Sequence, residues 1–530
     1  MRRLISQFGT RPSLVPVVLC AVVAVIWSVF GGTLVTRPFW MDEIHSWLLI
    51  SDPDSSHALQ ALSHGADYNP PAYYWAARSL GIAGQVTEFR LRLFSLMWSA
   101  LSVAGIGVLL RRRYSSVVSM TVACTIAAHP LFVLQSTEAR FYAMWLCLLI
   151  WYVILLTTEG SHSGNQQSSM RPVFLFGAGI LNAVICTTHY FGIISVGLVT
   201  GGWMLSRWRR GRPLLPGIVL SVIAVSSVAA CLPFLRGQRA ALTCSTWILP
   251  PTVSRSLDFL LQFVPAVPGL LYTLAGLGGW MSARSQRLAG AHAVAASGSI
   301  PSKPAGLQPA VSPDWMLSSL LLMPPVLVVF SWTVQPALVD RYAIVAIAGL
   351  VPVYAWLLGQ TAPTVQKAAL VCSLVGLAVS GPARRCHVGF HLQKADLQKV
   401  LNQLPADQPV IFEDRIAYWL LQHADPHPHR YQADHDHHSW ISHQTCAQSK
   451  RDVGRTVHHW YPSDFRLLNI SEDNIRPTGD HAESETRVHQ TITVVPSGRG
   501  AGTSAVSEFV AADFRTRLLI PELTEQQRPI

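Results

Sequence analysis

The stretch FYAMWLCLLIWYVILLTT, residues 141–158, carries no charged side chain. About 20 consecutive apolar residues are enough for a helix to cross the hydrocarbon core of a bilayer. The stretch therefore predicts a transmembrane helix. Ten further runs of this kind occur, some interrupted by Gly or Pro, which membrane helices tolerate. They lie near residues 14–36, 92–110, 115–135, 173–189, 191–206, 214–235, 258–280, 315–334, 342–359 and 364–381.

Composition agrees with this reading of the apolar runs. Of the 530 residues, 50% are hydrophobic and 13% are charged, whereas soluble proteins carry about 25% charged residues. The net charge of +11 comes from short basic clusters, such as residues 111–113 and 207–212, that lie between apolar runs. Cytoplasmic loops collect Lys and Arg in this way, which argues against nucleic-acid binding. The sequence predicts a mainly α, polytopic membrane protein with about 11 transmembrane helices.

One orientation places all the basic loops on the same side. With the N-terminus in the cytoplasm, the polar C-terminal region lies outside the cell's inner (plasma) membrane. We expect a membrane domain over residues 1–381, with a large first outer loop at 37–91 and a flexible cytoplasmic linker at 282–314. Residues 382–530 are expected to form a small, partly irregular α/β domain, in which PVIFED (409–414) is a strand.

Two adjacent carboxylates follow the first apolar run, in FWMDEIHSWLLI (39–50). Asp42 and Glu43 stand between Trp40 and Trp47, and tryptophan favours the membrane–water interface. Outer loops often carry acids that have no function. An acid held at the interface is partly desolvated, however, which raises its pKa and makes it a better general base.

The same outer loop contains HGADYNPPAYYWAARSLG (64–81). Two prolines precede a helical segment whose first turn presents Tyr73, Tyr74 and Trp75. These rings suit the membrane interface or stacking on a sugar. An ordinary amphipathic helix at the interface is an equally good interpretation.

Two charged pairs lie at the outer ends of predicted spans. Glu138 and Arg140 fall between two spans, and Asp340 and Arg341 precede another. A salt-bridged turn or a snorkelling arginine accounts for each pair without any function. Arginine is also the side chain best suited to bind a lipid phosphate, because its guanidinium donates paired hydrogen bonds.

Histidines supply weaker signals. His189 ends a predicted span, where a histidine is more often structural than a ligand. The segment at 423–443 is rich in His and Asp, which are metal ligands, but its spacing matches no fixed metal site. We interpret it as a solvated loop.

The order of these motifs is more informative than each of them alone. Asp42-Glu43 is followed by DYNPPAYY (67–74) and RLFS (92–95), then by EARFY (138–142) and by Arg341-Tyr342. In this order the sequence resembles the GT-C superfamily of membrane glycosyltransferases. Within it, the sequence is most similar to the bacterial branch of protein O-mannosyltransferases and the lipid A aminoarabinose transferase. The expected opening of that branch's outer tail, D-W-R, is replaced here by ADLQKVL.

The resemblance implies a polyprenyl-phosphate-linked sugar donor and a lipid, glycan or protein acceptor. Asp42 would deprotonate the acceptor hydroxyl for an inverting attack, and Glu43 would position the acceptor or the sugar. Arg140 and Arg341 would stabilise the departing lipid phosphate. The remaining candidate substrate-binding residues are Asp67, Tyr73, Tyr74, Glu138, Tyr142 and His189.

No cofactor or metal is expected, because arginines alone can neutralise a lipid monophosphate. A divalent ion, which some members of the superfamily use, is the less favoured alternative. A transporter or flippase is the main competing function, since charged residues within membranes often mark a substrate path. A structural or sensory protein that acts through its soluble tail is a third.

Overall fold

The computed structural model describes most of the chain between Phe39 and Val388, and three short strands beyond it. Several predicted features lie outside the described residues. They are the run at 14–36, Trp40, most of the run at 258–280, the linker at 282–314 and most of the C-terminal region. The residues described are 39, 41–52, 54–81, 86–158, 172–242, 248, 250–263, 278, 281, 315–388, 410–412, 431–433 and 495–496.

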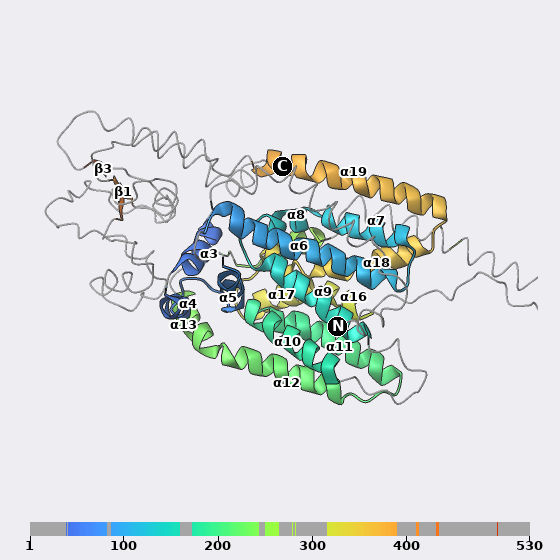
Figure 1. The fold of residues 1–530 in the computed structure, drawn as a ribbon, viewed down its shortest axis with the longest axis horizontal. Coiled ribbons are helices and arrows are strands. Elements are labelled where there is room, and N and C mark those ends of the chain that lie inside the picture. Colours follow the sequence, from blue (N-terminus) through green and yellow to red (C-terminus); the bar gives the residue numbers. More distant parts are fainter. Residues whose placement is uncertain are drawn as a thin grey trace, which may run out of the picture. The chain divides into compact units, whose positions relative to one another are not determined.

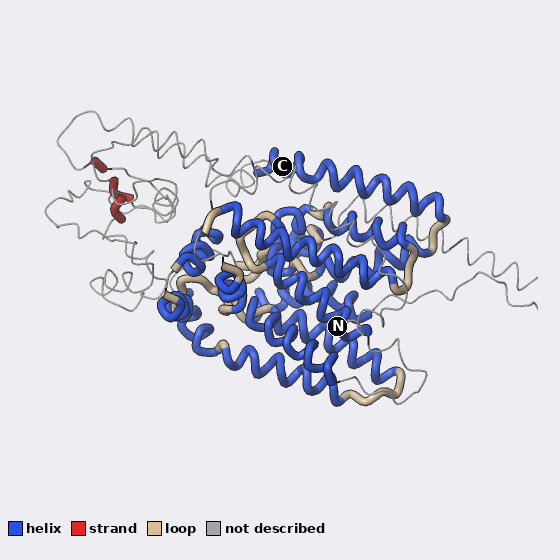
Figure 2. Tube along the Cα trace, in the orientation of Figure 1, coloured by secondary structure: helices blue, strands red, loops and turns tan. Residues whose placement is uncertain are grey.

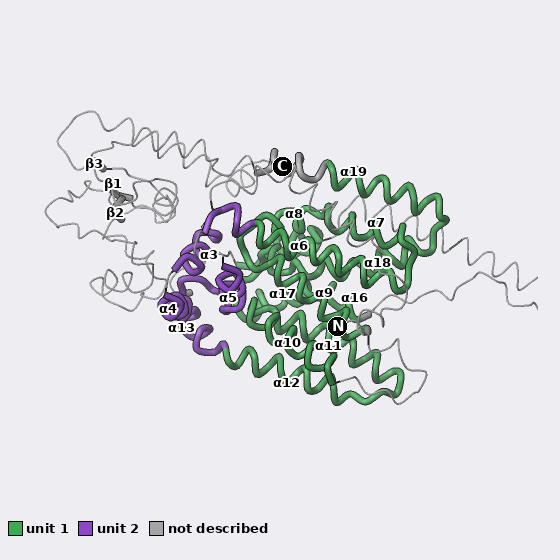
Figure 3. The backbone as a smooth tube through the Cα atoms, viewed as in Figure 1, with its two compact units in different colours: residues 1–32, 93–230, 248–384 green, residues 33–92, 231–247, 385–530 purple. Residues whose placement is uncertain are grey.

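The chain divides into two compact units (Figure 3). Unit 1 contains residues 1–32, 93–230 and 248–384, and unit 2 contains residues 33–92, 231–247 and 385–530. Helix α6 begins in unit 2 and continues in unit 1. Each unit is thus assembled from segments that are far apart in the sequence.

Unit 1 is built from helices, drawn in blue in Figure 2. Helix α9 is formed by the uncharged stretch quoted above. Helix α10 packs against both α9 and α12 (Figure 1). The elements of unit 1 are α6 (Glu88–Arg111), α7 (Ser116–Ala127), α8 (Pro130–Ser136), α9 (Tyr142–Thr158), α10 (Pro172–Thr188), α11 (Gly192–Arg209), α12 (Leu215–Ala230), α14 (Val253–Leu261), α16 (Trp315–Ser318), η3 (Ser319–Leu322), α17 (Met323–Thr333), η4 (Asp340–Ala343), α18 (Ala346–Gly359) and α19 (Pro363–Val388).

Helix α12 has an outer face that suits lipid. Helix α12 exposes Leu215, Ile218, Val222 and Val225 along one stripe, and the exposed fractions reach 67%. Its opposite face includes Gly217, where an added Cβ would lie 2.4 Å from a side-chain atom of Met204 on α11. Small residues that let helices approach closely are typical of packing inside membranes. An apolar outer face around a tightly packed inner face is the arrangement expected of a membrane protein.

Two described helices are long and apolar enough to cross a bilayer, namely residues 88–111 and 316–333. The number rises to four if two pairs of broken helices each count as one span. One such pair is α7 and α8, which meet at 69° because the chain breaks before Pro130. A proline is readily accepted in the first turn of a helix but not in its interior. The predicted mainly α membrane fold is confirmed, whereas the count of about 11 spans stays a prediction.

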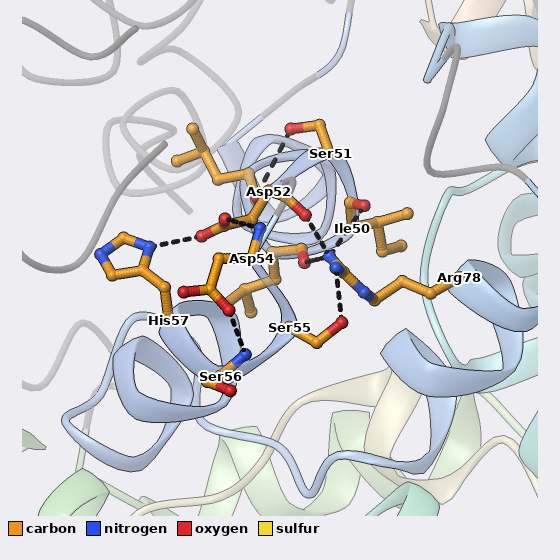
Figure 4. A network of polar contacts seen from close by, with 10 residues as sticks. Ile50, Ser51, Asp52, Asp54, Ser55, Ser56, His57 and Arg78 are labelled. Carbon is orange, nitrogen blue, oxygen red and sulfur yellow. Dashed lines mark hydrogen bonds and ion pairs between the residues drawn. The ribbon is translucent and has the colours of Figure 1, made fainter. Parts of the chain in front are cut away.

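Unit 2 holds the helices that carry the acidic motif. They are α3 (Met41–Ser51), α4 (Ser55–Ser63), α5 (Ala72–Ser79) and α13 (Leu232–Leu242). Arg78 on α5 closes the end of α3 by donating hydrogen bonds to the carbonyl oxygens of Leu49, Ile50 and Asp52 at 2.6–3.2 Å (Figure 4). These carbonyls have no partner within the helix, so Arg78 satisfies them.

The junction between α3 and α4 is also fixed by side chains. The carboxylate of Asp54 accepts from the backbone N–H of Ser56 and so caps α4. The carboxylate of Asp52 accepts from the backbone N–H of Asp54 and lies 2.5 Å from Nδ1 of His57 (Figure 4). The predicted first outer loop is therefore largely helical.

The C-terminal region contributes three short strands, drawn in red in Figure 2. They are β1 (Val410–Phe412), β2 (Tyr431–Ala433) and β3 (Val495–Pro496), in the order β2-β1-β3. Strand β1 is parallel to β2 and antiparallel to β3. It coincides with the strand predicted in PVIFED, but the α/β domain as a whole stays a prediction. The His-rich segment lies outside the described residues except for β2.

Candidate active site

Asp42 and Glu43 lie in the first turn of α3. Carboxylates are favoured there by the free backbone N–H groups and the positive end of the helix dipole. Asp42 is half-buried, whereas Glu43 is fully buried. Of the two adjacent acids, Asp42 is thus the one whose side chain reaches the protein surface in the described part of the chain.

The carboxylate of Glu43 is held by Arg92 from the start of α6. Nε of Arg92 donates to Oε1 at 2.8 Å, and a terminal nitrogen donates to Oε2 at 2.5 Å. The guanidinium also lies 5.4 Å from the ring centre of Phe39. This gives Glu43 a protein partner in the described conformation. Its predicted part in positioning the acceptor or the sugar stays a prediction.

Asp67 organises the turn before α5. The residue is 4% exposed, and its carboxylate accepts from the Tyr74 hydroxyl at 2.6 Å, from Nδ2 of Asn69 at 2.9 Å and from the backbone N–H of Tyr68 at 2.6 Å. Tyr73 and Tyr74 are buried, and their rings meet edge to face at 5.6 Å. A sugar could stack on these rings only after a rearrangement. Substrate binding by the three residues stays a prediction.

A small recess in unit 2 is lined by Leu49, Leu62, Tyr74, Trp75 and Arg78, among others. Its volume of about 10 Å³ leaves room for roughly one water molecule. The recess is therefore too small to hold a sugar.

Unit 1 buries the second acidic and basic pair. Glu138 and Arg140 are each 4% exposed. The guanidinium carbon of Arg140 lies 5.2 Å from the ring centre of Phe141, and the hydroxyl of Ser95 donates to the carbonyl oxygen of Arg140 at 3.4 Å. A cation packed on an aromatic ring away from water interacts more strongly with an anion than an exposed one does.

Aromatic rings surround His189 at the end of α10. Its ring stacks on Trp145 at 4.7 Å with an angle of 6° between the planes, and it lies 6.2 Å from Tyr142 and 5.4 Å from Tyr342. Nδ1 of His189 accepts from the backbone N–H of Phe191 at 3.0 Å. That bond leaves Nε2 as the ring nitrogen able to carry the proton of a neutral imidazole.

Arg341 lies in η4, directly before Tyr342. Its backbone N–H donates to the carboxylate of Asp340 at 2.7 Å, and its side chain is half-buried. Element η4 packs against α8 and α17. Because Tyr342 contacts His189, unit 1 brings the Arg341 segment to the same aromatic cluster as Arg140 and Tyr142.

The predicted residues thus fall into two groups. Unit 2 holds Asp42 and Glu43 on α3. It also holds Asp67 in the turn before α5, and Tyr73 and Tyr74 on α5. Unit 1 holds Glu138, Arg140, Tyr142 and His189, with Arg341 next to them in the chain. In the described part of the chain, no cluster of three or more His, Cys, Asp or Glu side chains could hold a metal ion. The expectation that the reaction requires no metal ion stays a prediction.

Several contacts at these sites had no local signal in the sequence. Trp145 and Tyr342 reach His189 from distant segments. Gln238 on α13 donates to the carbonyl oxygens of Leu62 and Asn69, each at 3.1 Å. Arg92 was visible in the RLFS motif, but nothing in the sequence pointed to Glu43 as its partner.

No family model and no curated protein matches the chain. Among solved structures, ArnT from Cupriavidus metallidurans bound to undecaprenyl phosphate matches with a TM-score of 0.50 and 14% identity, over 84% of this chain and 89% of that one. ArnT in the apo state matches with a TM-score of 0.51 and 13% identity, over 79% and 89%. The chain has the GT-C fold.

The resemblance to GT-C proteins is thereby confirmed at the level of fold. A GT-C oligosaccharyltransferase from Archaeoglobus fulgidus also matches, with a TM-score of 0.41 and 14% identity, over 83% of this chain and 61% of that one. The multi-pass membrane architecture expected of a GT-C protein agrees with the apolar helices described above.

Proposed function

We propose that the chain is an integral membrane glycosyltransferase that uses a polyprenyl-phosphate-linked sugar. The observation that carries this proposal is the shared fold with ArnT bound to undecaprenyl phosphate, which extends over 84% of the chain. The acceptor is a lipid, a glycan or a protein at the outer face of the inner (plasma) membrane. The N-terminus is cytoplasmic in this proposal, and residues 382–530 are extracytoplasmic.

Asp42 is the proposed general base. Its carboxylate removes the proton of the acceptor hydroxyl while the hydroxyl oxygen attacks the anomeric carbon of the donor. The bond from that carbon to the phosphate oxygen breaks, and the electron pair leaves with the polyprenyl phosphate. The configuration inverts because a single displacement occurs. The exposure of Asp42 beside a buried Glu43 supports this assignment.

The leaving phosphate gains negative charge as its bond to the sugar breaks. Arg140 and Arg341 are proposed to stabilise that charge, because cations placed where charge develops lower the barrier. The burial of Arg140 against Phe141 supports a strong interaction with phosphate. No metal ion is needed in this proposal, and none takes part in a step.

A transporter of a lipid-linked substrate is the alternative. It would share the membrane fold and the phosphate-binding arginines, but it would not need a base. Asp42 therefore separates the two functions, and a transporter with Asp42→Asn would retain its activity.

The test compares wild type with Asp42→Asn in lipid nanodiscs. Donor consumption is first measured by mass spectrometry of lipid extracts from cells that make either form. Transfer is then assayed with the purified full chain in the nanodiscs. We expect transfer to fall by about 10²–10⁴-fold, the usual contribution of a general base. Binding of undecaprenyl phosphate should change by less than about twofold, since the base does not contact the phosphate.

Asp54→Asn is the matched control. Asp54 is exposed and caps α4, and asparagine retains that cap. Transfer by this variant should equal that of wild type. Unchanged transfer in Asp42→Asn would remove Asp42 as the base, and movement of an intact lipid-linked sugar without any transfer would favour the transporter.

A further inference from the structure

Glu43 and Arg92 form a two-pronged ion pair that is closed to solvent. The two nitrogen–oxygen distances are 2.8 and 2.5 Å, and both side chains are 0% exposed. Paired N–H···O bonds of this type fix the relative orientation of the two groups as well as their separation. We call this pair the clasp.

The clasp is poorly explained as a source of stability. Removing two charges from water costs several kcal/mol for each, roughly what their attraction returns, so well-packed apolar side chains do equally well. Its geometric precision is the property that apolar packing would not supply. The ring of Phe39 next to the guanidinium restricts Arg92 further.

The position of the clasp gives this precision a use. Glu43 immediately follows Asp42 in the first turn of α3. The other end of α3 is fixed by Arg78 through three carbonyl oxygens (Figure 4). An arginine thus fixes each end of the helix that presents Asp42. Arg92, which belongs to the clasp, is the one at the end that carries Asp42.

We propose that Glu43 and Arg92 are positioning residues that set the direction of the Asp42 carboxylate, and that neither contacts substrate. The proposal rests on the function proposed above. It departs from the sequence-based expectation that Glu43 positions the acceptor or the sugar. It also separates Arg92 from Arg140 and Arg341, which are proposed to bind the donor phosphate.

A double-mutant cycle tests whether the two residues act as one unit. Arg92→Lys keeps the charge but cannot form the two parallel bonds, and Glu43→Asp keeps the charge but shortens the reach. Each variant should lower kcat by about 10–100-fold, because a displacement of about 1 Å in a reacting group has that cost. The KM values for donor and acceptor should stay within about twofold of wild type.

The double variant Arg92→Lys/Glu43→Asp should be no slower than the slower single variant, since the clasp is already broken in each. Separate roles would give multiplied losses, with a raised KM for the acceptor in Glu43→Asp or for the donor in Arg92→Lys. Either result would overturn the proposal. The neutral pair Glu43→Gln/Arg92→Met buries no charge and serves if a single variant does not fold; its kcat should fall as in Arg92→Lys.

A readout without turnover separates this proposal from the proposed function. Modification of Asp42 by a carbodiimide and an amine is followed by peptide mass spectrometry at one pH. The rate should change by more than about threefold in the clasp variants, because a loosened first turn alters the exposure of Asp42. Modification of Asp54 should not change.

The two failures then look different. Normal transfer by Asp42→Asn would refute the base, while the labelling of Asp42 would still report whether the clasp positions it. Unchanged labelling and unchanged kcat in every clasp variant, together with an inactive Asp42→Asn, would refute the clasp and leave the proposed function intact.

Discussion

Arg140 and Arg341 share a proposed role but have different surroundings. Arg140 is buried and lies over the ring of Phe141, whereas Arg341 is half-buried in a short 3₁₀ turn. A phosphate that met Arg140 would interact with it at low dielectric, where charge–charge attraction is strongest. Arg140 should therefore contribute more to donor binding than Arg341.

Replacing Arg140 with Gln should weaken binding of undecaprenyl phosphate. A hydrogen bond to a charged group is worth about 1.5–3 kcal/mol, which corresponds to roughly a 10–100-fold rise in Kd. Arg341→Gln should raise Kd by less. Binding is measured with undecaprenyl phosphate in nanodiscs that hold the full chain.

Arg209→Gln is the matched control for charge. Arg209 is exposed in the last turn of α11, and its substitution alters the net charge by the same amount. An equal loss of binding in Arg209→Gln would show that total charge, not Arg140, governs affinity. Unchanged binding in Arg140→Gln would remove Arg140 from the donor site.

Residue types were easier to predict than their partners. The Asp42-Glu43 pair stood out because adjacent acids between tryptophans are unusual, and the structure separates them into one half-buried and one buried side chain. The partner of Glu43 is 49 positions away, so no local pattern could name it. The three donors to Asp67 lie within seven residues of it, yet spacing alone did not reveal that its carboxylate is occupied.

Helices α4 and α13 approach each other so closely that one position between them excludes a side chain. A Cβ added to Gly237 would lie 2.0 Å from the carbonyl oxygen of Ser63. Next to it, Gln238 donates to the carbonyl oxygens of Leu62 and Asn69. The side chain of Gln238 therefore links α13 to the end of α4 and to the turn before α5.

Gly237→Ala should destabilise unit 2 by about 1–3 kcal/mol, because the clash is with backbone that cannot rotate away. Thermal unfolding of the full chain in detergent should show a lower midpoint, and transfer should fall with it. Gly197→Ala is the control, since nothing lies within 4 Å of its Cβ position in α11. There the higher helix propensity of alanine should leave the midpoint equal or raised.

Apolar runs predicted helices well because hydropathy is a local property. Helix α9 at Tyr142–Thr158 nearly coincides with the predicted run at 141–158. The run at 115–135 was predicted as a single span but contains a break before Pro130. The run at 315–334 was also predicted as a single span, and residues 316–333 do form one helix, with a 3₁₀ stretch at Ser319–Leu322. The sequence shows the position of each proline. Whether that proline ends, bends or begins a helix depends on packing in three dimensions.

For the whole chain, we predict that transfer needs no metal ion, and this prediction can be tested. Two arginines suffice to neutralise a lipid monophosphate, so removal of divalent ions should leave transfer within about twofold of its starting rate. The purified chain is treated with EDTA, desalted and assayed with its donor. Inhibition that Mg²⁺, Mn²⁺ or Zn²⁺ reverses would contradict this expectation.

The bonds from Gln238 to Leu62 and Asn69 also set an order of events during synthesis. They join residues 176 and 169 positions apart, so the segment that carries Asp42 lacks its contacts with α13 until the ribosome has added all of the intervening chain. At about 5–20 residues per second, that interval is roughly 10–30 s. During it, helices α6 to α12 are synthesised while the acidic segment lacks its contacts with α13. A nascent chain stopped before residue 231 should therefore leave this segment open to protease, and one that extends past residue 242 should protect it.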